Sequence, residues 1–393
     1  MLPLTSFLSC TAPIDELECF STRQKHHAKT YVTGLVAASN KTVDGISTHV
    51  LPAKSERALN KFLTEYNWDE DQLNKERLEL LQQADDTRWS SEGVVIIDDT
   101  FTHKTGKKIP NAGKFYDHTI PGYIWGQNLI YALYADEKTT YPLGFRLYEK
   151  DAKRRVELAI DLVDELIEIG VPADTYLFDI SYCSEEFVTH LEGYGKEWVS
   201  AVKSDALVTY GGERIRVDAL AERVDTVPRT IDGDTYQIWT QKREVGRLGA
   251  VKLLITKKES TDQNEEDDEP SVKYIVSNKI DASASHLIKL YAMRWRIETF
   301  FRDTKQDLGF GDCELRHAAG ASRHWHLLML AYSLLKLGAA HSALGTVLGH
   351  AASLRADIKR SVREGVENLL SWALNSPNRS IDELMHEIEG IFV

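Results

Sequence analysis

Apolar residues recur at helical spacing through the first part of the chain, around Tyr31–Val36 and again around Ala58–Leu63. Short polar breaks separate these runs, so the pattern predicts several short helices over residues 12–87. Short helices with basic residues would suit a helix-turn-helix DNA-binding region within residues 1–90. A plain helical cap is the alternative, and it is favoured because helical pairs are common and the basic residues are scattered. The basic residues of this region are Arg23, Lys25, His26, His27, Lys29, Lys41, Lys54, Arg57 and Lys61.

The pattern changes at Gly93. Val94–Ile97 is a wholly apolar, β-branched run that ends at Asp98, as expected of a strand buried on both faces. The elements expected next are strands at 123–134 and 141–148, an amphipathic helix at 152–169 ended by Gly170, a strand at 175–178, a helix at 184–191 and a strand at 198–202. This order predicts an α/β fold with a mixed sheet and helical cover.

The alternation of strands and helices is interrupted in residues 203–285. The segment contains β-like runs at Tyr236–Trp239 and Val251–Ile255 and an acidic loop at Glu265–Pro270, so we predict a β-rich insertion. Helix returns at about Ala284. The expected organisation is a helical region at 1–90, the first part of an α/β core at 91–202, the insertion at 203–285, completion of the core at 286–345 and a helical tail at 346–393. The tail carries Arg355, Lys359, Arg360 and Arg363, for which dimer contacts and DNA contacts are both open.

Composition and charge limit the possible functions. The chain has 393 residues, of which 42% are hydrophobic, enough for a sizeable core. The formal net charge of -13 argues weakly against a nucleic-acid partner, because phosphate contacts need Lys and Arg, but a local basic groove is compatible with it. The four cysteines form no C-x-x-C pair, which favours reduced thiols over disulfides or a zinc site.

The chain shows no targeting or membrane segment. Residues 1–9 lack the charged and apolar regions of a signal peptide. The longest apolar stretch, Leu327–Leu344, is interrupted by Ser333, Lys336 and His341, so we expect a buried helix there. A cytoplasmic protein is therefore expected.

Two carboxylates follow predicted strands directly. Asp98 comes after the first strand and Asp179 after the strand at 175–178. In open α/β sheets, ligands bind at the carboxyl ends of strands, and adjacent strand ends would bring these side chains together. Hard oxygen ligands of this kind suit Mg²⁺ or Mn²⁺. The alternative for each is an aspartate that caps a turn.

A stripe of polar residues is predicted on the helix near 291–305. Tyr291, Arg294, Glu298 and Lys305 lie at offsets of zero, three, seven and fourteen, within roughly 60° of one another on a helix. The glutamate would complete a metal site, and the other three side chains would bind phosphates. A surface helix with an Arg294–Glu298 ion pair is the alternative.

Other residue types carry weaker signals. His317, His324 and His326 do not have zinc-site spacing and are interpreted as partly exposed. Trp295 lies beside Arg294 and could stack on a base, but core packing is the preferred interpretation.

The spacing Tyr-x2-Arg-x3-Glu-x6-Lys resembles the Y-R-E-K signature of the insertion-sequence DDE transposases, the IS-four-like group and its relatives, and all four positions match. Asp98-Asp99-Thr100 looks like the D-x-T motif of this family, which favours Asp98 as first ligand with Asp99 as the alternative. Asp179 looks like the second aspartate. The resemblance covers roughly residues 20–340.

The resemblance implies an RNase H-like catalytic core with a β-rich insertion and helical regions at both ends. It implies two Mg²⁺ ions, replaceable by Mn²⁺, held by Asp98, Asp179 and Glu298. Tyr291, Arg294 and Lys305 would bind DNA. The implied reaction is phosphodiester hydrolysis and strand transfer on double-stranded DNA, at terminal inverted repeats and at a target. Synapsis of two DNA ends leads us to expect a homodimer on DNA.

The sequence leaves three alternatives to a transposase open. The chain could be a metal-dependent DNA nuclease without strand transfer, or a non-catalytic DNA-binding protein derived from a transposase. It could also be an unrelated two-carboxylate hydrolase such as a glycosidase, whose activity would not need metal.

Overall fold

The structure is a computed structural model, and it describes residues 8–50, 55–117, 122–259, 272–341, 353–375, 380 and 382–383. The chain divides into two compact units. Unit 1 comprises Met1–Trp89, Asp99–Lys153 and Glu298–Val393, and unit 2 comprises Ser90–Asp98 and Arg154–Ile297. Of the four divisions along the chain, one falls inside strand β1 (Val94–His103) and another inside helix α9 (Trp295–Asp307).

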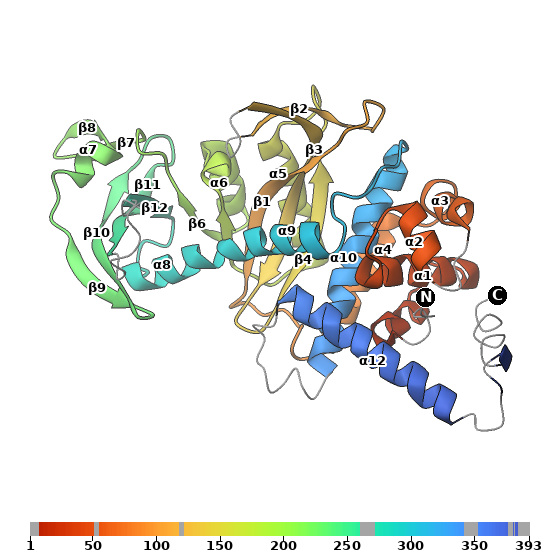
Figure 1. Cartoon of the computed structure of the whole chain (residues 1–393). Coiled ribbons are helices and arrows are strands. Elements are labelled where there is room, and N and C mark those ends of the chain that lie inside the picture. The colour runs from red at the N-terminus through yellow and green to blue at the C-terminus, as the bar shows by residue number, and fades with distance from the viewer. Residues whose placement is uncertain are drawn as a thin grey trace. The chain divides into compact units, whose positions relative to one another are not determined.

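Helix α10 (Ala318–His341) is the centre of the helical part of unit 1 (Figure 1). Every side chain from Leu327 to Leu335 is buried, as expected of a helix surrounded by other elements. Its neighbours are η1 (Ser9–Asp15), α1 (Thr22–Ala37), α3 (Glu56–Thr64), α4 (Glu70–Gln83), α12 (Leu354–Leu374) and β4 (Thr140–Leu147). The predicted short helices, which also include α2 (Val43–His49), and the predicted buried helix are confirmed. No helix in the described part of the chain is long and apolar enough to cross a membrane.

Several basic residues of the first 90 positions make internal contacts. Lys29 forms an ion pair with Asp15 at 2.6 Å, and Lys25 donates to the backbone carbonyl of Asp15. Lys41 is buried and its ammonium donates to the carbonyl oxygens of Leu35 and Ala38. These contacts favour the helical-cap interpretation, while the helix-turn-helix interpretation stays a prediction.

The strands of unit 1 form an antiparallel group. β3 (Gly122–Ala135) pairs with β2 (Gly113–Asp117) on one edge and with β4. β3 also lies beside β1, where a Cβ added at Gly126 would be 2.1 Å from the carbonyl oxygen of Thr102. This close approach of two backbones requires glycine. The sequence pattern predicted β3 and β4 but missed β2, whose five residues show no apolar run.

The first half of β1 begins the sheet of unit 2. It pairs in parallel with β5 (Thr175–Phe178), which pairs in parallel with β6 (Glu197–Ala201). The parallel connections run through α5 (Arg155–Ile169) and α6 (Glu185–Gly193). Gly170, at φ 82°, ends α5 in the left-handed conformation, as predicted. The predicted α/β fold with a mixed sheet is confirmed.

The β-rich character of residues 203–285 is also confirmed. After β6 the sheet continues antiparallel in the order β12, β11, β10, β9, so these strands extend the core sheet. A separate hairpin, β7–β8, and a short helix, α7, complete the segment. Their bounds are β7 Leu207–Tyr210, β8 Glu213–Arg216, α7 Val217–Ala221, β9 Val227–Ile231, β10 Asp234–Glu244, β11 Ala250–Lys258 and β12 Val272–Ser277. The predicted acidic loop at 265–270 lies outside the described residues.

The polar stripe was predicted on one helix, but the structure has two. α8 (Ala284–Met293) packs against β5, β6 and β12, and α9 begins after Arg294. The backbone N–H of Arg294 donates to Tyr291, and that of Ile297 donates to Arg294. These i to i−3 bonds tighten the turn and interrupt the α-helical pattern. Another side of α9 is apolar and faces the core, since Ile297 and Phe300 are buried.

The turn that follows α9 is held by buried side-chain donors in unit 1. His324 contacts the carbonyl oxygen of Gly309 at 3.1 Å, and Trp325 donates to that of Phe310 at 3.2 Å. Lys104, just after β1, donates to the carbonyl oxygens of Gly311 at 2.8 Å and Cys313 at 2.7 Å. Burial lowers the pKa of Lys104. Lys104 therefore links the end of β1 to the turn that follows α9.

We predict that Lys104→Met lowers the free energy of unfolding by about 1–3 kcal/mol, because the buried carbonyl oxygen of Cys313 and the partly buried one of Gly311 lose their donor. Urea denaturation measures the change. The control is Lys108→Met, at an exposed lysine, for which a change within about 0.5 kcal/mol is expected. Equal stability of the two variants would contradict a stabilising role for the contact.

His324 was expected to be partly exposed, but it is fully buried, and burial lowers its pKa to about 3. The unfolded chain binds a proton on this ring below pH of about 6.5, whereas the folded chain does not until about 3. Stability is therefore lost as pH falls from 6.5 toward 3.

Between pH 7 and pH 5 we expect His324 to account for a loss of about 2 kcal/mol in the free energy of unfolding. His324→Gln should reduce the pH 7 to pH 5 difference by that amount. His317→Gln, at an exposed histidine, should leave the difference unchanged. The same slope in all three proteins would rule out a buried neutral ring at position 324.

Candidate active site

The pairing of β1 with β5 places two predicted ligands next to each other. The strands run in parallel with Ile97 opposite Phe178, and the next residues are Asp98 and Asp179. Asp179 follows β5 as predicted, but Asp98 lies inside β1, which continues to His103, so the expectation that Asp98 follows the end of its strand was wrong. The pairing of the two strands ends at Ile97 and Phe178, and Asp98 and Asp179 therefore lie side by side at the carboxyl end of this paired segment, where neighbouring strands are about 5 Å apart. Both are half-buried. The structure thus brings together the two aspartates that the sequence analysis singled out.

Arg294 supplies a positive charge at this edge. Its Nη1 lies 3.1 Å from Oδ2 of Asp98, and only 15% of the arginine side chain and 16% of the aspartate side chain are exposed. The guanidinium carbon of Arg294 lies 5.8 Å from the centre of the Tyr291 ring. Two residues of the polar stripe and the first aspartate therefore form one cluster in unit 2.

Asp179 has a local contact as well. Its carboxylate accepts a hydrogen bond at 3.3 Å from the backbone N–H of Ser181, and so it caps the short helix η2 (Ile180–Tyr182). The capping alternative considered for this residue is thus present in the structure. A single long hydrogen bond leaves further acceptor positions on the carboxylate.

Asp99 has different surroundings. Successive residues of a strand point to opposite faces, so the side chain of Asp99 is turned away from that of Asp98. Its Oδ2 accepts a hydrogen bond at 2.7 Å from Nδ2 of the buried Asn128 on β3. This contact belongs to unit 1, and it indicates a structural role for Asp99.

Glu298 and Lys305 lie on α9 within unit 1. Glu298 is in the first turn of the helix, four residues after Arg294, and is half-buried. Lys305 is in the last turn and is exposed. Trp295, at the start of the same helix, is 61% exposed, so the core-packing interpretation of this residue was wrong.

Asp98 and Asp179 suit a hard divalent cation by their chemistry, because both side chains offer carboxylate oxygens. Among the described residues, no group of three or more His, Cys, Asp or Glu side chains is already arranged around a metal position. At Asp98 the positive charge of Arg294 balances the carboxylate.

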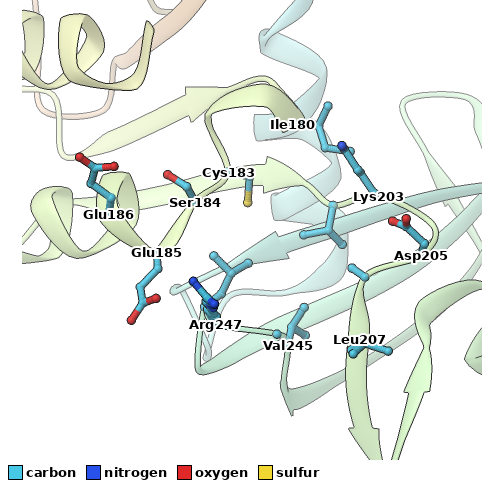
Figure 2. A pocket seen from close by; sticks show the side chains of 14 residues that line it. Ile180, Cys183, Ser184, Glu185, Glu186, Lys203, Asp205, Leu207, Val245 and Arg247 are labelled. Carbon is cyan, nitrogen blue, oxygen red and sulfur yellow. The ribbon is translucent and has the colours of Figure 1, made fainter. Parts of the chain in front are cut away.

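A cleft of about 500 Å³ begins directly after Asp179 within unit 2. Figure 2 shows Ile180 and Cys183 on one side and Val245 and Arg247, from the β10–β11 turn, on the other. Burial raises the pKa of Cys183 to about 11. The sequence pattern did not reveal this cleft, since its two sides come from segments about sixty residues apart.

Comparison with known proteins identifies the family. Residues 17–244, more than half of the chain, match the sequence model of a protein family described as DDE superfamily endonuclease. The chain belongs to this family. Enzymes of the DDE superfamily depend on divalent metal ions.

Two further comparisons agree with this DDE assignment. A probable transposase for insertion sequence element IS701 from Microchaete diplosiphon is 23% identical over 285 residues, which cover 67% of this chain and 70% of the relative. The piggyBac transposase, in a synaptic complex with hairpin DNA, has a similar structure, with a TM-score of 0.51 and 13% identity over 99% of this chain and 82% of that one. The structural likeness confirms the predicted RNase H-like fold. The matches together support a DDE enzyme with transposase function.

The contrast between Asp98 and Asp99 can be tested by stability. Asp99→Ala removes the nearer of two acceptors for the buried Asn128 amide, since the Thr100 carbonyl oxygen lies at 3.3 Å, and it should lower the free energy of unfolding by about 1–3 kcal/mol. Asp99→Asn keeps an acceptor oxygen and should lose less. Urea denaturation compares the two variants, and an Asp99→Ala protein as stable as wild type would contradict the structural role.

Proposed function

We propose that this DDE enzyme belongs to the insertion-sequence group with the Y-R-E-K signature. It hydrolyses phosphodiester bonds at the ends of an element and joins the released ends to target DNA. The observation that carries the proposal is the adjacent position of Asp98 and Asp179, directly after the paired segment of two parallel strands, together with the ion pair between Arg294 and Asp98. A carboxylate pair and a signature arginine in one cluster suit phosphoryl transfer better than glycoside hydrolysis.

The residue roles follow from the chemistry of the side chains. Asp98, Asp179 and Glu298 are proposed as the ligands of two Mg²⁺ ions, which supply activation of a water or a DNA 3′-hydroxyl and stabilisation of the leaving oxygen. Asp98 is preferred to Asp99 because Asp99 is bound to Asn128. Mn²⁺, with the same preference for oxygen ligands, would substitute.

The remaining signature residues are proposed to hold DNA. The guanidinium of Arg294 can bind two phosphate oxygens at once, and the hydroxyl of Tyr291 can donate to a third. Lys305, exposed in the last turn of α9, is proposed to contact the backbone further along the strand. In this proposal the three side chains hold the DNA in position, and the metal ions, when bound, supply positive charge at the reacting phosphate.

The domain roles are proposed on the same basis. Residues 91–202 and 286–345 form the catalytic core, 203–285 the β-rich insertion, and 1–90 and 346–393 the helical regions. The substrates are double-stranded terminal inverted repeats and target DNA. A homodimer on DNA is proposed because two ends must be brought together, and the helical regions are the candidates for dimer and DNA contacts.

The proposal predicts metal-dependent cutting and joining that needs all three carboxylates. With DNA carrying the element's ends and Mg²⁺, Asp98→Asn, Asp179→Asn and Glu298→Ala should each reduce cleavage by at least about 100-fold. EDTA should abolish cleavage by the wild type, and Mn²⁺ should restore it. Gel separation of cut and joined products measures both steps.

Asp99→Asn is the matched control, with the same chemical change one residue away, and cleavage should stay within about tenfold of wild type. Cutting that survives Glu298→Ala would remove this residue from the active site. Cut products without joined products would favour a nuclease that lacks strand transfer. Absence of any cutting by the wild type would favour a non-catalytic DNA-binding relative.

A further inference from the structure

The carboxylate of Asp98, which we propose as the first metal ligand, forms an ion pair with Arg294. Nη1 of Arg294 lies 3.1 Å from Oδ2 of Asp98, and about 85% of each side chain is shielded from solvent. Such shielding makes the attraction stronger than in a surface ion pair. A divalent ion bound to the same oxygen would be repelled by the guanidinium at that distance. The metal and Arg294 therefore compete for Asp98.

The surroundings of Arg294 would allow its side chain to change partner. Arg294 is the single residue between α8 and α9, and its backbone is held by i to i−3 bonds rather than by a regular α-helical ladder. The Tyr291 ring lies 5.8 Å from the guanidinium. A planar guanidinium binds a phosphate as well as a carboxylate, because both present two oxygens at matching spacing.

We propose that Arg294 holds the metal site closed until DNA is bound. When DNA binds, one of its phosphates pairs with the guanidinium in place of Asp98, and the Asp98 carboxylate can then bind the divalent ion. This exchange rests on the proposed function, in which Asp98 is a metal ligand. It makes DNA and metal bind with positive coupling, and thermodynamic linkage requires the coupling to be the same in both directions.

The first test needs no catalysis. Isothermal titration calorimetry measures the binding of Mn²⁺ to the full chain without DNA. Arg294→Gln, which removes the charge but keeps a polar side chain, should bind Mn²⁺ about tenfold or more tightly than wild type. Arg296→Gln makes the same charge change two residues away and should stay within about threefold of wild type.

The coupling is tested from the DNA side. Fluorescence anisotropy measures the binding of a labelled random-sequence duplex, because phosphate contacts do not depend on sequence. Mn²⁺ should tighten DNA binding by wild type about tenfold and should have little effect on Arg294→Gln.

The outcomes separate this exchange from the proposed function. Tighter Mn²⁺ binding by Arg294→Gln that is lost when Asp98→Asn is added supports the exchange. If Arg294→Gln does not bind Mn²⁺ more tightly than wild type, or if Arg296→Gln tightens binding equally, the exchange is overturned. If Asp98→Asn nevertheless weakens Mn²⁺ binding by the wild type, Asp98 is still supported as a metal ligand. Mn²⁺ binding that is unaffected by Asp98→Asn in both backgrounds overturns the assignment of Asp98 and the exchange with it.

Discussion

The parallel pairing of β1 with β5 is the interaction on which the candidate site depends. Ile97 faces Phe178 in this register, and the two residues that follow are aspartates. Every residue of Val94–Ile97 and Thr175–Phe178 is buried, so a slip of one position would place Asp98 or Asp179 opposite a buried apolar residue of the neighbouring strand. The cost of burying a carboxylate thus favours the register that keeps the two aspartates together. This register also creates a local excess of negative charge, which Arg294 balances at Asp98.

The position of Arg294 follows from the packing of α8. This helix lies against β5, β6 and β12, and its last turn leads to the break before α9. A continuous helix would fix the arginine backbone within a regular ladder of hydrogen bonds. At the tighter turn the guanidinium forms an ion pair with the Asp98 carboxylate and lies 5.8 Å from the centre of the Tyr291 ring. This break in the helix therefore lies next to the ion pair between Arg294 and Asp98.

The net charge of -13 gives an incomplete account of DNA binding. Lys41, Lys104 and Arg323 are buried, and their donors bind backbone carbonyl oxygens, so they stabilise turns and helix ends. These cations contribute to the fold and are not available to phosphates. In the proposed function, DNA binding depends on a small number of cations such as Arg294 and Lys305, and it weakens as the salt concentration rises.

The sequence by itself determined the elements whose signals are local. The strand at Thr175–Phe178 with Asp179 directly after it, the helix ended by Gly170 and the spacing from Tyr291 to Lys305 are all local features, read from hydrophobic periodicity and turn chemistry. The apolar run Val94–Ile97 marked the start of β1 but not its end, because the strand continues past Asp98 to His103. Only the tertiary structure decided what depends on partners far along the chain. The hydrogen bond from Asn128 gives Asp99 different surroundings from those of Asp98. The strands of the insertion extend the core sheet, and Lys104 is buried against a turn about two hundred residues away in the sequence. Periodicity reports which face of an element is apolar, but the residue that meets that face is set by the packing of distant segments.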